Sequence, residues 1–240
     1  MGVIVEVCVD TSASLRAAVE GGADRIELCA ALALGGLTPS AGFMAEAAGL
    51  PVPVMAMIRP RAGDFAFSEP EMRQMETDIA TARAAGLAGV VLGASLPDGR
   101  LDTATLTRLL RAAGGMDTTL HRVFDLTPDL DEALETAIDL GFHRILTSGG
   151  GRTAPEGMDR IGTLIAQAAG RISILPGAGI SAASAAAFVA LGVTELHGSC
   201  ATPRSTPGRA AEMGFGPPTT RQTDAALVRA LRQAVSKAVH

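Results

Sequence analysis

The chain has 240 residues, of which 48% are hydrophobic and 19% charged, and its formal net charge is −5. This balance excludes an intrinsically disordered chain, because enough apolar surface can be buried to offset the entropy lost on folding. Aromatic residues make up 3%, all of them phenylalanine. An acidic chain with so few rings does not suit nucleic-acid binding, so we expect no nucleic-acid partner.

The sequence also lacks the patterns of membrane and secreted proteins. It has no run of about 18 uncharged apolar residues, which excludes a spanning helix. Its first residues, Met1–Glu6, have no basic region followed by an apolar one, so no signal peptide is expected. Three cysteines do not suit a disulfide framework and are expected to be reduced thiols. We therefore predict a cytoplasmic protein without a membrane partner.

Short apolar segments alternate with longer helical patterns along the chain. Strands are predicted at Val3–Val9, Arg25–Leu28, Pro53–Ile58, Gly89–Gly93, Thr118–Arg122, Arg144–Ser148, Ile172–Pro176 and Glu195–Gly198. Helices are predicted between them, including Glu69–Ala85, Thr103–Ala113, Pro128–Leu140 and Pro155–Ala169, and a final helix at Thr223–Ala238. Ser68 and Thr127 each precede a segment with the composition of a helix start.

A small repeat recurs through these units. Five times, a glycine suited to end a helix is followed four residues later by a branched apolar residue that begins a strand. The pairs are Gly22/Ile26, Gly86/Val90, Gly141/Ile145, Gly170/Ile174 and Gly192/Leu196.

Eight strand–helix units in about 240 residues predict an α/β fold, a (β/α)8 TIM barrel that forms a single domain over residues 1–240. An open doubly wound sheet is the alternative, but no glycine fingerprint follows the first strand. The segment 202–220 is rich in proline and glycine and is predicted to be a long loop before the final helix.

In such a barrel, functional groups lie where the strands end. Polar residues alternate with apolar ones there and are expected to point inward. Taken singly, each could be half of a structural ion pair or a hydrogen-bonded core histidine. Together they would bury several charges at one mouth, so we predict a functional pocket. The candidate catalytic residues are Glu6, Glu27, Arg59, His121, Asp125 and His197.

A second set of residues is suited to binding an anionic ligand. Glycine turns follow the seventh and eighth strands, where TIM barrels often bind phosphate through backbone N–H groups, although glycines also simply make tight turns. Arginines after the third strand suit a carboxylate or phosphate. The candidate ligand-binding residues are Arg61, Ser148, Gly177, Gly179 and Gly198.

Cys8 and Cys29 occupy equivalent positions on neighbouring predicted strands, each two residues beyond an inward glutamate. Paired thiolates suit Cu(I), whereas unpaired cysteines more often pack as small apolar residues. Cys200 is expected in the same sector, because the eighth strand of a closed barrel lies beside the first. Both interpretations of the cysteines stay open on spacing alone.

Several segments resemble the CutC copper homeostasis protein family, in order along about five-sixths of the chain. They are Glu6–Asp10, Gly21–Cys29, Gly35–Ser40, Met57–Phe65, His121–Asp125, Arg144–Gly149 and His197–Ser199. The resemblance implies a cytoplasmic TIM barrel, commonly a homo-oligomer, connected with copper. It also implies Cu(I) ligands at Cys8 and Cys29.

Two functions therefore compete. In the first, the protein binds Cu(I) through cysteine thiolates and needs no turnover. In the second, it is an enzyme for a small anionic, sugar-like or phosphorylated substrate, with Glu27 or Glu6 as base, the two histidines as acid or electrophile, and Arg59 on the anion. Proton abstraction next to a carbonyl suits this set. Schiff-base chemistry does not, because the sole lysine is Lys237. A hard divalent ion held by Glu, Asp and His is a variant of the second function.

Overall fold

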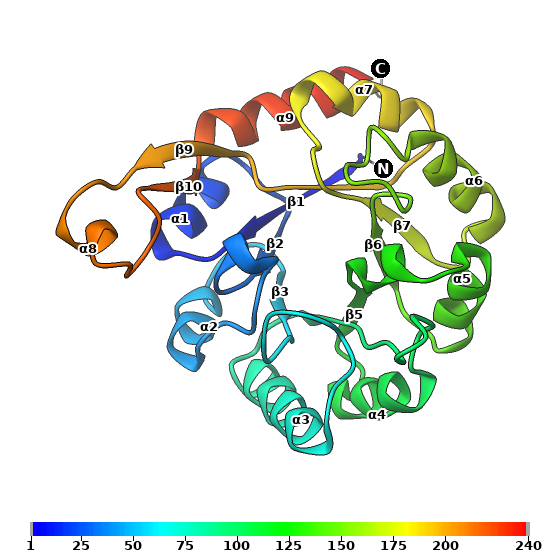
Figure 1. The fold of residues 1–240 in the computed structure, drawn as a ribbon. Coiled ribbons are helices and arrows are strands. Elements are labelled where there is room, and N and C mark those ends of the chain that lie inside the picture. The colour runs from blue at the N-terminus through cyan, green and yellow to red at the C-terminus, as the bar shows by residue number, and fades with distance from the viewer. Residues whose placement is uncertain (1, 239–240) are drawn as a thin grey trace.

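A computed structural model describes residues 2–238 and shows a nearly closed ring of parallel strands surrounded by helices (Figure 1). The strands are β1 (Ile4–Val9), β2 (Arg25–Leu28), β3 (Val54–Met57), β4 (Gly89–Leu92), β5 (Asp117–Leu120), β6 (Arg144–Thr147), β7 (Ser173–Pro176) and β8 (Glu195–Gly198). Neighbours pair in parallel from β7 through β1 to β8. The two ends of this sheet meet where the hydroxyl groups of Ser173 and Thr194 lie 3.3 Å apart. The predicted TIM barrel is confirmed.

The helices alternate with the strands and cover the outside of the ring (Figure 1). They are α1 (Ser12–Glu20), α2 (Ala41–Ala47), α3 (Glu69–Ala84), α4 (Thr103–Ala113), α5 (Leu130–Asp139), α6 (Met158–Ala168), α7 (Ala182–Ala190), α8 (Arg209–Glu212) and α9 (Ala225–Ala238), with short 3₁₀ helices η1 (Leu32–Leu34) and η2 (Arg122–Leu126). None of the helices in the described part of the chain has the length and hydropathy that crossing a membrane requires.

The glycine repeat predicts the helix-to-strand turns correctly. All five glycines have φ between +76° and +86°, the left-handed region in which a Cβ atom would be strained. The apolar residues four positions later are buried between strands and helices. Inside the ring, a smaller apolar cluster is formed by Cys29, Met55, Met57 and Val91. The sheet thus has an apolar outer face and a mixed inner face.

Helix starts are predicted correctly at Ser68 but wrongly at Thr127. The backbone N–H of Ser68 donates to Glu71 Oε2 at 2.7 Å, as a capping box requires. Helix α5 begins at Leu130 instead, because the Asp129 side chain accepts from the backbone N–H of Asp131 at 2.8 Å. The Thr127 hydroxyl donates to the Phe124 carbonyl at 2.8 Å and closes the preceding 3₁₀ turn.

The segment 202–220, predicted to be a loop, is a connection with a short helix, α8, in its middle, but its two ends form a β-hairpin. Strand β9 (Ala201–Ser205) pairs antiparallel with β10 (Thr219–Thr223), and the hairpin projects away from the barrel past α1 (Figure 1). Threonines favour the extended backbone in both strands, and a two-stranded edge tolerates Pro203. Most of the glycines and prolines that suggested a loop lie between the two strands, around α8.

Gly89 gives a direct test of packing inside the ring. A Cβ atom there would lie 2.3 Å from both the Asp117 carbonyl oxygen and Met55 Cε. We expect Gly89→Ala to lower the free energy of unfolding by about 1–3 kcal/mol, measured by urea denaturation. Gly49→Ala is the control, because a Cβ atom at that position would have no neighbouring atom within 4 Å, and it should change stability by less than about 0.5 kcal/mol. Equal stability of the two variants would contradict this packing.

Candidate functional site

A chain of buried ion pairs crosses the lower part of the barrel. Arg25 on β2 donates to Glu6 on β1 and to Glu195 on β8. Arg144 on β6 donates to Glu195 Oε2 at 3.1 Å and to Asp117 Oδ2 at 2.7 Å. The side chains of Arg25, Glu6, Glu195 and Arg144 are each at most 9% exposed. These partners compensate charges that would otherwise be costly to bury, and they connect strands on opposite sides of the ring.

This ion network changes the interpretation of Glu6. The sequence predicts Glu6 as a catalytic residue at the mouth, but one of its oxygens is held by Arg25 and the other lies 2.7 Å from His197 Nδ1. Burial alone would raise the pKa of Glu6, but the hydrogen bond from His197 and the charge of Arg25 together lower it to about 2. Glu6 is therefore a buried anion that orients His197 from below.

His197 connects the ion network to the mouth. With Nδ1–H donating to Glu6, its Nε2 faces Glu27, 3.8 Å from Oε2. Burial would lower the pKa of His197, but the neighbouring Cys8 and Glu27, together with Glu6, raise it well above its usual value. Burial raises the pKa of Glu27 despite the nearby His197 charge. Glu27 on β2 and His197 on β8 therefore lie side by side as a carboxyl–imidazole pair, and the charge of each affects the pKa of the other.

The barrel mouth contains a cavity of about 300 Å³ that brings together five residues predicted from separate strands. They are Cys8, Glu27, Arg59, His121 and His197. Leu32, Met57, Phe65 and Leu146 supply apolar parts of its wall. A partly apolar cavity with a few convergent polar groups is the usual form of a small-molecule site.

Three buried polar atoms of this cavity have no hydrogen-bond partner among the described residues: Glu27 Oε1, Arg59 Nε and His121 Nε2. The remaining groups of Arg59 are occupied, since Nη1 donates to the Leu34 carbonyl at 2.9 Å and Nη2 to the Gly63 carbonyl at 2.8 Å. Most buried polar atoms in proteins are paired. One acceptor and two nitrogen atoms, unpaired on residues that line one cavity, suit a polar molecule that supplies their hydrogen bonds.

The sequence predicts His121 within the strand Thr118–Arg122. In the structure, His121 is the N-terminal cap of η2. Strand β5 ends at Leu120, and His121 Nδ1 accepts the backbone N–H of Val123 at 3.2 Å. Burial, with a contribution from the Arg59 charge, lowers the pKa of His121 to about 3. A neutral ring that accepts at Nδ1 carries its proton on Nε2, which is buried and has no hydrogen-bond partner among the described residues. His121 is thus a neutral hydrogen-bond donor.

Asp125 and Ser148 do not line the mouth cavity, because both are used to build the turn after β6. Asp125 accepts from the backbone N–H groups of Ser148 and Gly150 at 3.0 Å and from the Thr147 hydroxyl at 2.5 Å. The Ser148 hydroxyl donates to the Gly151 carbonyl at 2.6 Å. The predicted catalytic aspartate and ligand-binding serine have structural partners, and we assign them no contact with a ligand.

Arg61 and Gly177 also lie outside the lining of the mouth cavity. Arg61 lies outside the mouth, where it donates to Glu71 at 2.5 Å and to Asp64 at 2.9 Å. Gly177 leaves room for the site, since a Cβ atom there would lie 2.5 Å from Leu146 Cδ1 and 3.3 Å from His197 Cδ2. Neither residue lines the cavity.

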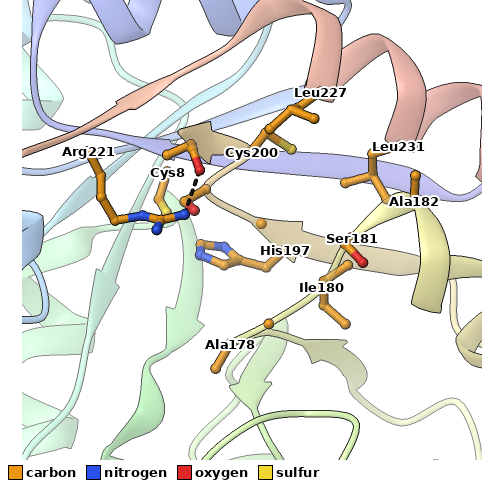
Figure 2. A pocket seen from close by; sticks show the side chains of 14 residues that line it. Cys8, Ala178, Ile180, Ser181, Ala182, His197, Cys200, Arg221, Leu227 and Leu231 are labelled. Atoms are coloured by element: carbon orange, nitrogen blue, oxygen red, sulfur yellow. Dashed lines mark hydrogen bonds between the residues drawn. The ribbon is translucent and has the colours of Figure 1, made fainter. Parts of the chain in front are cut away.

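Gly179 and Gly198 line a second cavity of about 470 Å³ beside the first (Figure 2). The two cavities share Cys8, Ala178 and His197. In Figure 2, His197 projects toward the side where Cys8 and Arg221 lie, and Arg221 donates to the Ala201 carbonyl. The N-terminus of α7 and Cys200 complete the wall. The hairpin, which sequence analysis did not predict, therefore contributes a cation beside the barrel mouth.

The structure groups Cys8 differently from the prediction. Cys8 Sγ, a carboxylate oxygen of Glu27 and a ring nitrogen of His197 lie within 4.8 Å of one another. Cys29 instead donates its thiol to Glu27 Oε2 at 3.5 Å and packs beside Met55 and Met57. Burial and the nearby Glu27 carboxylate raise the pKa of the Cys29 thiol well above its usual value. The close donor set is one thiol, one carboxylate and one imidazole.

Comparison with known proteins identifies the family. A model of the CutC family matches residues 3–202. A CutC family protein of Rhizobium meliloti (strain 1021) is 59% identical over 230 residues, which cover 95% of this chain and 94% of that relative. The chain belongs to the CutC family. The resemblance seen in the sequence motifs is thereby confirmed.

Solved structures agree with this CutC assignment. CutC from Streptococcus agalactiae, whose name refers to copper homeostasis, has a TM-score of 0.78 and 32% identity, covering 82% of this chain and 98% of that one. Phosphoribosylanthranilate isomerase from Thermotoga maritima has a TM-score of 0.60 at 15% identity, with 98% of each chain covered. At that identity the second likeness concerns the barrel fold alone.

The ion network of this CutC family chain predicts a large effect of Arg25. Arg25→Met leaves Glu6 and Glu195 buried without their shared cation, so the free energy of unfolding should fall by about 3–5 kcal/mol in urea denaturation. Arg73→Met removes an exposed pair with Glu69 and should cost less than about 1 kcal/mol. Similar losses in both variants would contradict a structural role for the network.

Proposed function

We propose that this CutC family chain is an enzyme that binds a small anionic or sugar-like molecule in the mouth cavity. The observation that carries the proposal is the set of three unpaired buried atoms on Glu27, Arg59 and His121, three residues that line one cavity of about 300 Å³. Burying these atoms without partners is unfavourable, and a ligand that supplies hydrogen-bond partners offsets this cost.

Each group has a distinct part in this proposal. Glu27 Oε1 accepts a proton or hydrogen bond from the ligand, and His197 Nε2, held by Glu6, is placed to exchange protons beside it. His121 donates from Nε2, and Arg59 provides positive charge. A phosphate on the ligand would extend into the second cavity, whose wall includes Gly179, Gly198, the first residues of α7 and the cation of Arg221.

The proposal is tested with a panel of phosphorylated and unphosphorylated sugars and carboxylates, measured as a ligand-induced rise in Tm. We expect at least one compound to stabilise the wild-type protein. Glu27→Gln and His121→Phe should reduce that rise, because each removes one partner of the ligand. His121→Phe also removes the acceptor of the Val123 N–H, so the Tm of each variant is first measured without ligand. Arg73→Met, on the outside of the barrel, is the matched control and should preserve it.

The absence of any stabilising compound across the panel would contradict the enzyme proposal. So would stabilisation that is unchanged in both mouth variants, because the ligand would then bind elsewhere on the protein.

Metal binding is the second candidate, favoured by the approach of Cys8, Glu27 and His197. The Glu6–His197 hydrogen bond has the form of the carboxylate–histidine contact that orients metal-bound imidazoles. A thiolate, an imidazole and a carboxylate suit Zn²⁺, which would act as a Lewis acid on a ligand oxygen. For Cu(I), the pair Cys8 and Cys29 is the softer donor set suggested by the family resemblance, but it fits less well, because the Cys29 thiol is hydrogen-bonded to Glu27.

The two ligand sets give different mutational patterns. If Zn²⁺ binds the close trio, Cys8→Ser should weaken binding at least about tenfold, and Cys29→Ser should have a smaller effect. If Cu(I) binds two thiolates, both substitutions should abolish competition with a Cu(I) chelator under anaerobic conditions. Cys200→Ser, outside both sets, is the control. Affinities for both ions that none of these substitutions changes would contradict metal binding at this site.

The partners of the chain are proposed on other grounds. A homo-oligomer follows from the family resemblance, and the projecting hairpin supports it, because Phe215 and Met213 expose 81% and 59% of their surface. A cytoplasmic location is likewise proposed, from the cysteine content and the family. Neither proposal is needed for the chemistry of the mouth cavity.

A further inference from the structure

The mouth cavity has two sides with opposite hydrogen-bonding character. On one side, Glu27 of β2 offers an unpaired acceptor, and His197 of β8 lies 3.8 Å from it. On the other, beyond the ends of β3 and β5, Arg59 and His121 offer unpaired nitrogen atoms. A ligand that satisfies both sides presents a hydrogen to Glu27 and an oxygen acceptor to Arg59 and His121.

Phe65 holds the two donors on one wall. The Arg59 guanidinium lies 4.7 Å from the centre of the Phe65 ring, and the His121 ring centre lies 4.8 Å from the same ring. Backbone contacts fix both donors further, since Arg59 donates to two carbonyl groups and His121 accepts from Val123. Two preorganised N–H donors on one wall are the arrangement that stabilises negative charge as it develops on an oxygen.

We propose that the substrate of the mouth cavity is an α-hydroxycarbonyl compound, a small ketose or aldose, whose enediolate is stabilised by His121 and Arg59 after Glu27 removes the α-proton. This inference rests on the proposed function and names its substrate class. The ligand carbonyl accepts from His121 and Arg59, and its α-carbon faces Glu27. The adjacent hydroxyl group lies toward His197.

The proton transfers balance without any further reactant. Glu27 takes the α-proton, the C–H electron pair becomes the carbon–carbon double bond, and the carbonyl oxygen becomes an enediolate oxygen. Glu27 then returns the proton to the former carbonyl carbon. His197 gives a proton to the oxygen of that carbon and recovers one from the neighbouring hydroxyl group. The result interconverts ketose and aldose, and reversal at the first carbon exchanges its hydrogen with solvent.

A neutral His121 is essential to this assignment, and it can be measured independently of turnover. The hydrogen bond from Val123 to Nδ1 places the proton on Nε2. The ¹⁵N spectrum of the histidine-labelled protein should therefore show His121 as the Nε2–H tautomer. A spectrum with the proton on Nδ1, or with a charged ring at neutral pH, would overturn the proposal.

The direct test is exchange of α-hydrogen for deuterium in D₂O, followed by ¹H NMR. The probes are glycolaldehyde, dihydroxyacetone and fructose, each with and without a terminal phosphate. We expect catalysed exchange of at least one probe by the protein as purified. Glu27→Gln should slow the exchange by about 10²–10⁴-fold, and His121→Phe by about 10²–10³-fold. The phosphorylated and free probes together report whether the second cavity binds phosphate.

Two exposed substitutions serve as controls for the exchange assay. Glu20→Gln and His143→Asn change the same residue types at the surface, away from both cavities, and should leave the rate unchanged. Glycolohydroxamate, a mimic of the enediolate, should bind the wild-type protein in calorimetry and bind His121→Phe at least tenfold more weakly. The Tm of each variant is measured alongside. It distinguishes a variant that has misfolded from one that is folded and has lost a ligand contact.

The outcomes separate this inference from the proposed function. Catalysed exchange that depends on Glu27 and His121, with hydroxamate binding, supports it. If none of the six probes exchanges and the hydroxamate does not bind, while another compound stabilises the protein through Glu27, the substrate class is wrong and the proposed function stands. If no compound of either panel binds, both are wrong.

Discussion

The interior of this barrel depends on the compensation of buried charge. From Asp117 the contacts run through Arg144, Glu195 and Arg25 to Glu6, and every link after the first carboxylate is nearly inaccessible to solvent. Such a chain is costly to break, because removing either arginine leaves buried carboxylates with less compensating charge in a medium that solvates them poorly. It connects side chains of β1, β2, β5, β6 and β8 across the inside of the ring. The ion network therefore supports the residues of the mouth, which it contacts through Glu6 and His197.

This support determines which groups are free to act. Glu6 has both oxygens occupied, so its role is to fix the orientation of His197. Glu27, one strand away, keeps an oxygen unpaired, and the same holds for one nitrogen atom each of Arg59 and His121. A fold satisfies its polar atoms wherever it can. Three of the unpaired buried atoms belong to residues that line one cavity, and this is where the proposed ligand would bind.

The fold was largely readable from the sequence, since the glycine turns and period-two strands depend on local backbone preferences. The inward residues Glu27, Arg59, His121 and His197 were placed correctly at one mouth for the same reason. The sequence could not show that both oxygens of Asp125 accept hydrogen bonds from the turn after β6. Its partners, Thr147, Ser148 and Gly150, are distant in the chain. Arg25 and Arg144 were missed as network members, although each begins a strand and faces inward. The hairpin could not be predicted from composition, because the prolines and glycines between β9 and β10 are typical of a loop and only the threonines of the two strands favour an extended backbone.

The donor set of the mouth bears on how a copper-related family name should be understood. A Cu(I) site of two thiolates needs neither the Arg59–His121 wall nor a carboxylate relay beneath an imidazole, and both are built here at the cost of burying charge. Cys8 contributes to the cavity beside Glu27 and His197, and Cys29 packs beneath it as a hydrogen-bond donor. Acid–base chemistry on a bound ligand accounts for all of these groups, including the unpaired ones. A metal ion on Cys8, Glu27 and His197 would account for only one side of the cavity, and the donors on the opposite wall would stay available to the proposed substrate.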